Sequence, residues 1–249
     1  MTYCVGMLVE SGLVMIADTR TNAGVDDISV YRKLHMLADS PDRIIVALTA
    51  GNLSITQSVL SQLAEGLPPA DEEGGVRTIA NMPTMFRVAQ LVGEEVRRAR
   101  ADIGKALEAE EISSGISILV GGRIGNGPLK LYRLYSEGNF IECQTEQPFL
   151  QIGETKYGRP ILDRALSYDT PLYETVKVGL ISFDSTLRSN LAVGRPLDLI
   201  AIPADPASAV IRRRIGVDDA YFNDLSTRWS LMLNEARATI PDPPFMIAE

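Results

Sequence analysis

Thr2 is the residue of this 249-residue chain best suited by type and position to covalent chemistry. It directly follows Met1, and a small second residue such as threonine permits removal of an initiator methionine. A free N-terminal threonine has a hydroxyl nucleophile beside its own α-amine. That amine, with a reference pKa of about 8, can act as a base near neutral pH. The sequence therefore suggests a nucleophile at Thr2 once Met1 has been removed.

A nucleophile of this kind needs a nearby cation to lower the pKa values of the reacting groups, and an acid to hold that cation. Asp18 ends an apolar strand-like run, and Lys33 lies in the next predicted strand, so these two residues could supply both. Gly51 lies on a predicted strand-to-helix turn, where its backbone N–H could stabilise a tetrahedral oxyanion. Taken singly, each residue is weak evidence, so only the complete set predicts chemistry.

Other catalytic arrangements are restricted by the single histidine, His35. It excludes a zinc motif built on a histidine pair. Cys4 with His35 is a conceivable nucleophile–base pair, but a structural histidine in a strand is the better interpretation. The glycines of residues 121–127 match neither phosphate-binding pattern and are interpreted as hairpin glycines. No residue cluster calls for a cofactor or a metal.

Composition limits the partners and the compartment. A formal net charge of −8 argues against nucleic acid as the main partner. No apolar stretch approaches the roughly 20 residues that span a membrane, and the N-terminus lacks the basic segment of a signal peptide. Cys4 and Cys143 lie in apolar strand-like runs and are predicted to be buried free thiols. We therefore expect a cytoplasmic protein, in which the basic runs 97–100 and 212–214 form solvated or subunit-facing stripes.

The elements that must position these residues follow from hydrophobic periodicity. Apolar runs bounded by turn signals, or residues alternating with a period of two, predict strands, and apolar residues three and four apart predict helices. The expected strands are 4–9, 13–17, 32–36, 44–48, 116–120, 129–135, 139–143 and 197–202. The expected helices are 52–64, 85–103, 157–167, 172–187 and 217–238, and a loop is expected at 66–75.

This order of elements predicts an α+β fold in which two antiparallel sheets are each covered by a pair of helices. The result is a four-layer αββα sandwich with an extra C-terminal helix. No shift in composition marks a domain boundary. We expect one domain at residues 1–210 and a C-terminal helical extension, residues 211–249, packed on the same domain.

The candidate residues also resemble, in order and near-correct spacing, the signature of proteasome β-subunits. The similarity extends into the segment before the second helix and the central hairpin, and it covers about the first 160 residues. Its motifs are Thr2, Ala17-Asp18-Thr19-Arg20, Lys33, Thr49-Ala50-Gly51, Asn81-Met82-Pro83, Ile118-Leu119-Val120-Gly121-Gly122 and Gly127-Pro128-Leu129-Lys130-Leu131-Tyr132.

Within this family the chain is most similar to the bacterial branch called Anbu, the ancestral β-subunit. Segments 11–25, 153–158 and 184–190 carry that similarity, and the extended C-terminal helix also fits. The related bacterial HslV peptidase is shorter at this end and matches less well. The resemblance implies a proteasome-subunit-like Ntn-hydrolase fold, threonine-type hydrolysis of amide bonds in peptides or unfolded proteins, and self-assembly into a ring or helical oligomer. The sequence does not reveal whether an unfoldase partner exists.

The matching positions imply a role for each candidate residue. Thr2 would be the nucleophile, with its α-amine as proton shuttle. Lys33 would be the cation, Asp18 its orienting partner, and Gly51 the oxyanion donor. The resemblance implies a substrate pocket lined by Thr21, Thr49 and Leu53.

Four further positions are implied as supporting residues, namely Arg20, Glu154, Asp184 and Ser189. Related subunits usually carry a serine at the position of Glu154, and they place the aspartate and serine that match Asp184 and Ser189 closer together. A carboxylate close to the α-amine would raise the pKa of that amine.

Two alternatives remain open at this point. A non-catalytic assembly or binding subunit would keep the fold and use its surfaces, as Glu154 and the long C-terminal helix suggest. An Ntn amidase would keep the nucleophile but hydrolyse a small amide, such as a γ-glutamyl or amino-acid-derived compound.

Overall fold

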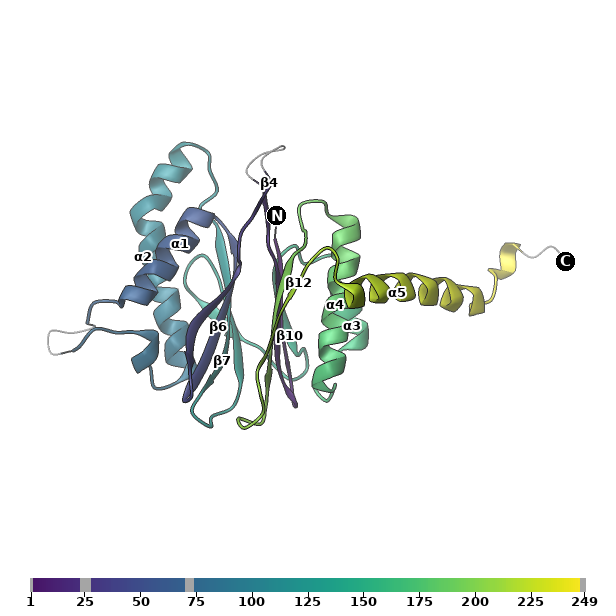
Figure 1. Ribbon diagram of the computed structural model, residues 1–249. Coiled ribbons are helices and arrows are strands. Elements are labelled where there is room, and N and C mark those ends of the chain that lie inside the picture. The colour runs from purple at the N-terminus through teal and green to yellow at the C-terminus, as the bar shows by residue number, and fades with distance from the viewer. Residues whose placement is uncertain (1, 23–27, 70–73, 247–249) are drawn as a thin grey trace.

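The computed structural model describes residues 2–22, 28–69 and 74–246. Met1, residues 23–25 of the segment compared with the Anbu branch, and part of the loop predicted at 66–75 lie outside these residues. The last three residues of the predicted extension do as well. Within the described residues, two antiparallel sheets lie face to face, and a pair of helices covers the outer face of each sheet (Figure 1).

The first sheet contains the strand that follows Thr2. Its order is β10-β1-β2-β11-β12, and all neighbouring strands are antiparallel. Every residue of β2 is buried, since this strand is central and both faces of the sheet are covered. The strands are β1 (Tyr3–Val9), β2 (Gly12–Asp18), β10 (Phe149–Gly153), β11 (Leu197–Pro203) and β12 (Ile211–Ile215).

The second sheet has the order β5-β6-β7-β8-β9 and is also antiparallel. A separate hairpin, β3 (Arg20–Asn22) with β4 (Ile28–Val30), leads from the first sheet to the second. The strands of the second sheet are β5 (Leu34–Ser40), β6 (Arg43–Gly51), β7 (Ile116–Ile124), β8 (Lys130–Leu134) and β9 (Phe140–Glu142).

Two helices cover each sheet. Helices α1 (Leu53–Glu65) and α2 (Met85–Ala109) pack on the second sheet, with a short 3₁₀ turn, η1 (Ile79–Asn81), between them. Helices α3 (Arg159–Ala165) and α4 (Leu172–Ser189) pack on the first sheet. The side chain of Asn52 caps α1 by accepting a hydrogen bond from the N–H of Ile55 at 3.2 Å.

Three apolar layers hold these four layers of structure together. One lies between the sheets and includes Leu13, Met15, Val46 and Leu48, and the other two lie under the helix pairs. Because alternate strand residues point to opposite faces, each sheet can contribute to two apolar layers. The predicted α+β class and four-layer αββα sandwich with an extra C-terminal helix are therefore confirmed.

The sequence predictions for several individual strands need correction. The strand expected at 32–36 begins at Leu34, so Lys33 precedes β5 instead of lying within it. Strands β3, β4, β10 and β12 were not predicted at all. In β12 the exposed Arg212 pairs with Asp39 at 2.7 Å, and Arg214 pairs with Asp198 at 2.9 Å, so this basic run belongs to an edge strand of the sheet.

The C-terminal helix α5 (Ala220–Thr239) extends away from the four layers, followed by the short turn η2 (Pro244–Met246) (Figure 1). Only Phe222 and Leu225 on this helix are buried, and they join the apolar layer under α4. The division of the chain at residue 210 stays a prediction.

Both cysteines are buried free thiols, as predicted. Across the described ranges, no helix is both long enough and apolar enough to cross a membrane.

Candidate active site

Thr2 is held in place by its neighbour Tyr3, the first residue of β1. Tyr3 is fully buried, and its ring packs on Phe183 of α4 with ring centroids 4.4 Å apart. Its hydroxyl lies 3.0 Å from Ser182 Oγ and accepts a hydrogen bond of 3.0 Å from Gln151 Nε2. Tyr3 therefore anchors the start of β1 in the first sheet. Thr2, which directly precedes β1, is half-buried.

The peptide between Thr2 and Tyr3 is hydrogen-bonded at both of its polar atoms. The carbonyl oxygen of Thr2 accepts from the N–H of Glu154 at 2.6 Å, and the N–H of Tyr3 donates to Asp18 Oδ1 at 3.1 Å. Gly153 has a φ of 80°, and a Cβ at this position would collide with the Thr2 carbonyl. A glycine is therefore needed for β10 to approach β1 this closely.

Asp18, at the end of β2, forms a buried ion pair with Lys33. Lys33 Nζ lies 2.6 Å from Asp18 Oδ1 and also donates to the Arg20 carbonyl at 2.6 Å. Asp18 Oδ2 accepts from the N–H groups of Arg20 and Gly194, each at 3.2 Å. Burial raises the pKa of Asp18, while the Lys33 ammonium and the N–H donors oppose that shift. With this set of donors, the carboxylate can remain charged and orient the lysine.

A pocket of about 360 Å³ opens beside Thr2 and brings most of the predicted residues together. Gly51 has a φ of 111°, and a Cβ there would collide with the Gly115 carbonyl, so the turn between β6 and α1 requires glycine. Tyr31 and Arg32, which the sequence interpretation missed, also line the pocket, and the adjacency of Arg32 to Lys33 was the only available signal. The predicted residues in the lining are Thr2, Thr21, Lys33, Thr49, Gly51 and Leu53.

The four predicted supporting residues are more dispersed. Arg20 donates to the Leu191 carbonyl at 2.7 Å and is absent from the lining of the pocket beside Thr2. Asp184 pairs with Arg188 on α4 at 3.1 Å, and with Arg20 it lines a separate cavity of about 490 Å³.

Ser189 is exposed at the end of α4. Glu154 is buried and contacts Thr2 through its backbone N–H. Two residues that the sequence interpretation did not single out, Asn190 and Gly194, contact the carboxylates of Glu154 and Asp18 respectively. Nothing in their residue types signalled these contacts, because both lie in an irregular segment.

Cys4 and His35 do not form a nucleophile–base pair in this structure. Cys4 is fully buried between the sheets, where its Sγ donates to the Thr49 carbonyl at 3.7 Å, and burial raises its pKa. His35 Nε2 lies 3.5 Å from Thr49 Oγ1, and burial lowers the pKa of the imidazole. Thr49 therefore contacts both residues, each through a different atom.

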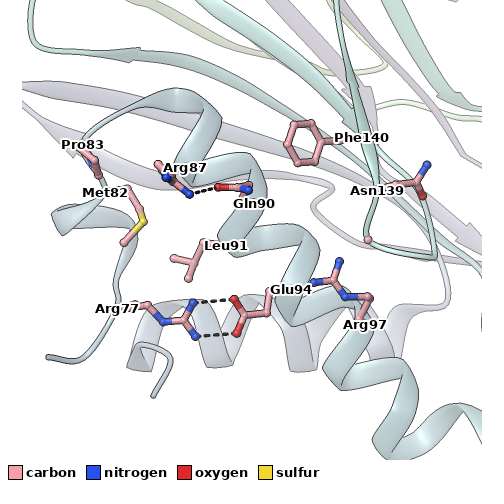
Figure 2. A pocket seen from close by; sticks show the side chains of 11 residues that line it. Arg77, Met82, Pro83, Arg87, Gln90, Leu91, Glu94, Arg97, Asn139 and Phe140 are labelled. Atoms are coloured by element: carbon pink, nitrogen blue, oxygen red, sulfur yellow. Dashed lines mark hydrogen bonds and ion pairs between the residues drawn. The ribbon is translucent and has the colours of Figure 1, made fainter. Parts of the chain in front are cut away.

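A larger cavity, of about 680 Å³, lies along α2 on the far side of the second sheet. Figure 2 shows Arg77 facing Glu94 there, with its two terminal nitrogens 2.7 and 2.6 Å from the carboxylate oxygens. This cavity contains none of the residues around Thr2. Within the described part of the chain, no group of three or more His, Cys, Asp or Glu residues could hold a metal ion.

A four-layer αββα fold with a threonine at the start of the first strand, beside a buried Lys–Asp pair, defines a proteasome-like Ntn-fold protein. Comparison with solved structures refines this class. Anbu (ancestral beta-subunit) from Yersinia bercovieri is 41% identical, with 99% of this chain and 100% of that chain covered and a TM-score of 0.87.

An Anbu (Gly-1) mutant from Hyphomicrobium sp. strain MC1 is 43% identical, with 98% and 99% of the two chains covered and a TM-score of 0.87. A structure described as the helical assembly of the Anbu complex from Pseudomonas aeruginosa is 42% identical, with 97% and 98% covered and a TM-score of 0.87. No protein-family model and no curated protein matches the sequence. The chain belongs to the Anbu family of proteasome-like proteins.

Proposed function

We propose that this protein is an N-terminal-threonine hydrolase that cleaves amide bonds in peptides or unfolded proteins. The observation that carries the proposal is the shared pocket of Thr2, Lys33 and Gly51, with Asp18 buried 2.6 Å from the lysine ammonium. These groups supply a nucleophile, a cation, an orienting carboxylate and an oxyanion donor, the parts that acyl transfer requires. Removal of Met1 provides the fifth part, the free α-amine.

The reaction uses two acyl-transfer steps. Thr2 Oγ attacks the substrate carbonyl carbon while the α-amine of Thr2 accepts the hydroxyl proton, directly or through water. The negative charge on the carbonyl oxygen is stabilised by the N–H of Gly51. The tetrahedral intermediate then collapses, the C–N bond breaks, and the α-ammonium returns the proton to the leaving amine. Water, deprotonated by the same α-amine, hydrolyses the resulting ester and restores Thr2.

Lys33 assists both steps through its charge. An ammonium close to Thr2 favours the deprotonated states of the hydroxyl and the α-amine, because like charges disfavour a second cation nearby. Asp18 holds the lysine in place beside the pocket, since it fixes one of the ammonium donors at 2.6 Å. The Arg20 carbonyl fixes a second donor at the same distance.

The pocket favours a residue of modest size before the scissile bond. Thr21, Thr49 and Leu53 contribute two hydroxyl-bearing side chains and one apolar side chain to the lining, and Arg32 contributes a cation. A volume of about 360 Å³ lies at the lower end of the range for pockets that hold small ligands.

Self-assembly is part of the proposal. The Anbu complex from Pseudomonas aeruginosa forms a helical assembly, and this chain has the same fold at 42% identity. Its helix α5 extends from the body with Leu231, Met232 and Leu233 exposed, and a second copy could cover these side chains. We place this oligomer in the cytoplasm.

Hydrolysis of a broad peptide library tests the proposal. Wild type should cleave a subset of peptides, Thr2→Ala should lose this cleavage, and Thr2→Ser should keep part of it because the hydroxyl nucleophile is retained. Equal cleavage by wild type and Thr2→Ala would contradict the proposal.

One observation supports a second candidate. Because the pocket is compact, a small amide such as a γ-glutamyl compound could fill it without a long peptide. The same three variants assayed on γ-glutamyl amides separate the two substrates. A Thr2-dependent release of amine from these compounds, without cleavage of any peptide, would favour the amidase. If Thr2→Ala matches wild type on both substrate classes and in cellular function, the protein is instead a non-catalytic assembly or binding subunit.

A further inference from the structure

Residues 190–196, which we call the bridging segment, connect two carboxylates on either side of Thr2. At one end, Asn190 Nδ2 donates to Glu154 Oε2 at 3.0 Å. At the other end, the N–H of Gly194 donates to Asp18 Oδ2 at 3.2 Å. Between these ends the segment folds on Asn190, whose Oδ1 accepts from the N–H of Ala192 at 3.0 Å. A single short segment therefore contacts both Glu154 and Asp18.

These two residues hold the same peptide group. The N–H of Glu154 donates to the Thr2 carbonyl, and Asp18 accepts from the N–H of Tyr3. The oxygen and the nitrogen of the peptide between Thr2 and Tyr3 are thus held from opposite sides, and the bridging segment connects the two residues that hold them. A shift of either residue would move the Thr2 hydroxyl and α-amine relative to Lys33.

The bridging segment is itself fixed by two side-chain hydrogen bonds and by one buried side chain, so a shift at one of its ends can reach the other. Arg20 Nη1 donates to the Leu191 carbonyl at 2.7 Å, and Thr19 Oγ1 donates to the Pro196 carbonyl at 2.6 Å. Val193 is buried in the apolar layer under α4. Arg20 and Thr19 directly follow Asp18, so the segment is attached to the end of β2 by both side chains.

The Glu154 carboxylate is already fully engaged. Its Oε2 accepts from Asn190, its Oε1 accepts from the N–H of Lys156 at 2.8 Å, and the residue is 7% exposed. A carboxylate oriented by two donors in this way is suited to fixing geometry, since neither oxygen is left without a donor.

We propose that Glu154 and Asn190 are positioning residues for Thr2, acting through the bridging segment on Asp18 and through the Glu154 backbone on the Thr2 carbonyl. This inference rests on the proposed function of Thr2. In this role Glu154 acts through its hydrogen bonds, and not through the effect of its charge on the α-amine. The inference also adds Asn190 to the site.

A charge-conserving swap tests the inference. Glu154→Gln alone directs an amide NH₂ at the NH₂ of Asn190 or at the N–H of Lys156. Asn190→Asp alone places two carboxylates face to face. The double variant, Glu154→Gln with Asn190→Asp, restores every hydrogen bond with one donor direction reversed and the net charge unchanged. It completes a double-mutant cycle.

The first readout is the rate at which an electrophile that requires both a hydroxyl and a free α-amine labels Thr2, measured against pH. Each single variant should label about tenfold more slowly than wild type, the factor expected for one charge-assisted hydrogen bond, and the double variant should recover to within about threefold. Glu235→Gln and Asn234→Asp make the same chemical changes on the exposed part of α5 and should label like wild type.

Two results would overturn the inference. One is labelling of the single variants at the wild-type rate. The other is a double variant no faster than the singles, with the pH midpoint of labelling lowered wherever residue 154 has lost its charge. That second pattern would mean that Glu154 acts on the α-amine through its charge.

A second readout does not require a reactive Thr2. Amide hydrogen exchange at Tyr3 and Gly194 should accelerate about tenfold in each single variant and return in the double variant, provided that all variants melt cooperatively. Exchange unchanged in the singles would overturn the coupling. A wild type that never labels, but shows this exchange pattern, would contradict the proposed hydrolase function and leave the coupling between Glu154 and Asp18 supported.

Discussion

The ammonium of Lys33 and the carboxylate of Asp18 lie 2.6 Å apart in an interior where Asp18 is fully buried and Lys33 is 6% exposed. The same carboxylate oxygen accepts the N–H of Tyr3, the residue next to Thr2. The ion pair therefore has two roles: it fixes the cation of the proposed site and it fixes the start of β1. Stability and reactivity can be separated by experiment only if these roles are tested with different variants.

Lys33→Met should reduce both stability and reactivity. It leaves the Asp18 carboxylate buried without its cation, which should cost about 3–5 kcal/mol of unfolding free energy, measured by urea denaturation. Adding Asp18→Asn removes the buried charge and should recover most of that stability. Labelling of Thr2 should remain at least about 100-fold below wild type in both variants, because the cation is absent. Wild-type labelling in the double variant would contradict the role of Lys33.

Gly51→Ala should disturb the turn that carries the proposed oxyanion donor. The backbone there has a φ of 111°, and the new Cβ would meet the Gly115 carbonyl. We expect a loss of about 1–3 kcal/mol in unfolding free energy and a large loss of Thr2 labelling. The matched control is Gly216→Ala, where a Cβ would meet nothing within 4 Å and φ is not positive. The control should be neutral or slightly stabilising, and equal losses in both variants would argue against a special requirement at Gly51.

Tyr3→Phe tests the anchor beside Thr2 through the pH dependence of stability. Burial raises the pKa of Tyr3 to about 12, above its unfolded value of about 10. The contribution of this pKa shift to stability is therefore fully present below pH 10 and is lost as the pH rises through 12. At pH 8 the variant should be about 1 kcal/mol less stable than wild type, because Gln151 and Ser182 lose a partner.

Denaturation curves at pH 8, 10 and 11 measure this difference. The stability gap between the two proteins should shrink above pH 10, since phenylalanine has no proton to lose. A gap that stays constant from pH 8 to 11 would contradict the raised pKa.

Substitutions on α5 test self-assembly. Replacing Leu231, Met232 and Leu233 by glutamine keeps good helix formers but removes exposed apolar surface, so the fold of the single chain should be kept. Light scattering should show smaller particles than wild type at micromolar concentration. Leu225→Ala should instead reduce the unfolding free energy of the single chain by about 2–5 kcal/mol, because Leu225 is buried in the apolar layer under α4. Unchanged particle size in the glutamine variant would contradict a role for α5.

Much of the fold follows from the sequence because its strands and helices have clear periods. The apolar run of β2 predicts a buried strand, and the spacing of apolar residues in α2, three and four apart, predicts a helix. Strand β12 escaped prediction because an edge strand with Arg212, Arg213 and Arg214 has the composition of a solvated loop. Strand β10 escaped because its sequence, Phe149-Leu150-Gln151-Ile152-Gly153, is neither an unbroken apolar run nor a regular alternation of apolar and polar residues.

The pocket was more predictable than the residues behind it. Thr2, Lys33 and Gly51 lie at strand ends that a four-layer fold brings together, so their chain positions already indicate proximity. Asn190 and Gly194 act through one side-chain amide and one backbone N–H in an irregular segment. Such contacts depend on the path of the backbone, which no residue pattern encodes.

The central claim is that Thr2 becomes a reactive N-terminal nucleophile. An intact-mass spectrum before and after treatment with an electrophile that requires both a hydroxyl and a free α-amine tests it most directly. The account predicts a protein lacking Met1 and a single adduct that maps to Thr2 and is absent from Thr2→Ala. A protein that retains Met1, or a free Thr2 that never forms the adduct, would contradict it.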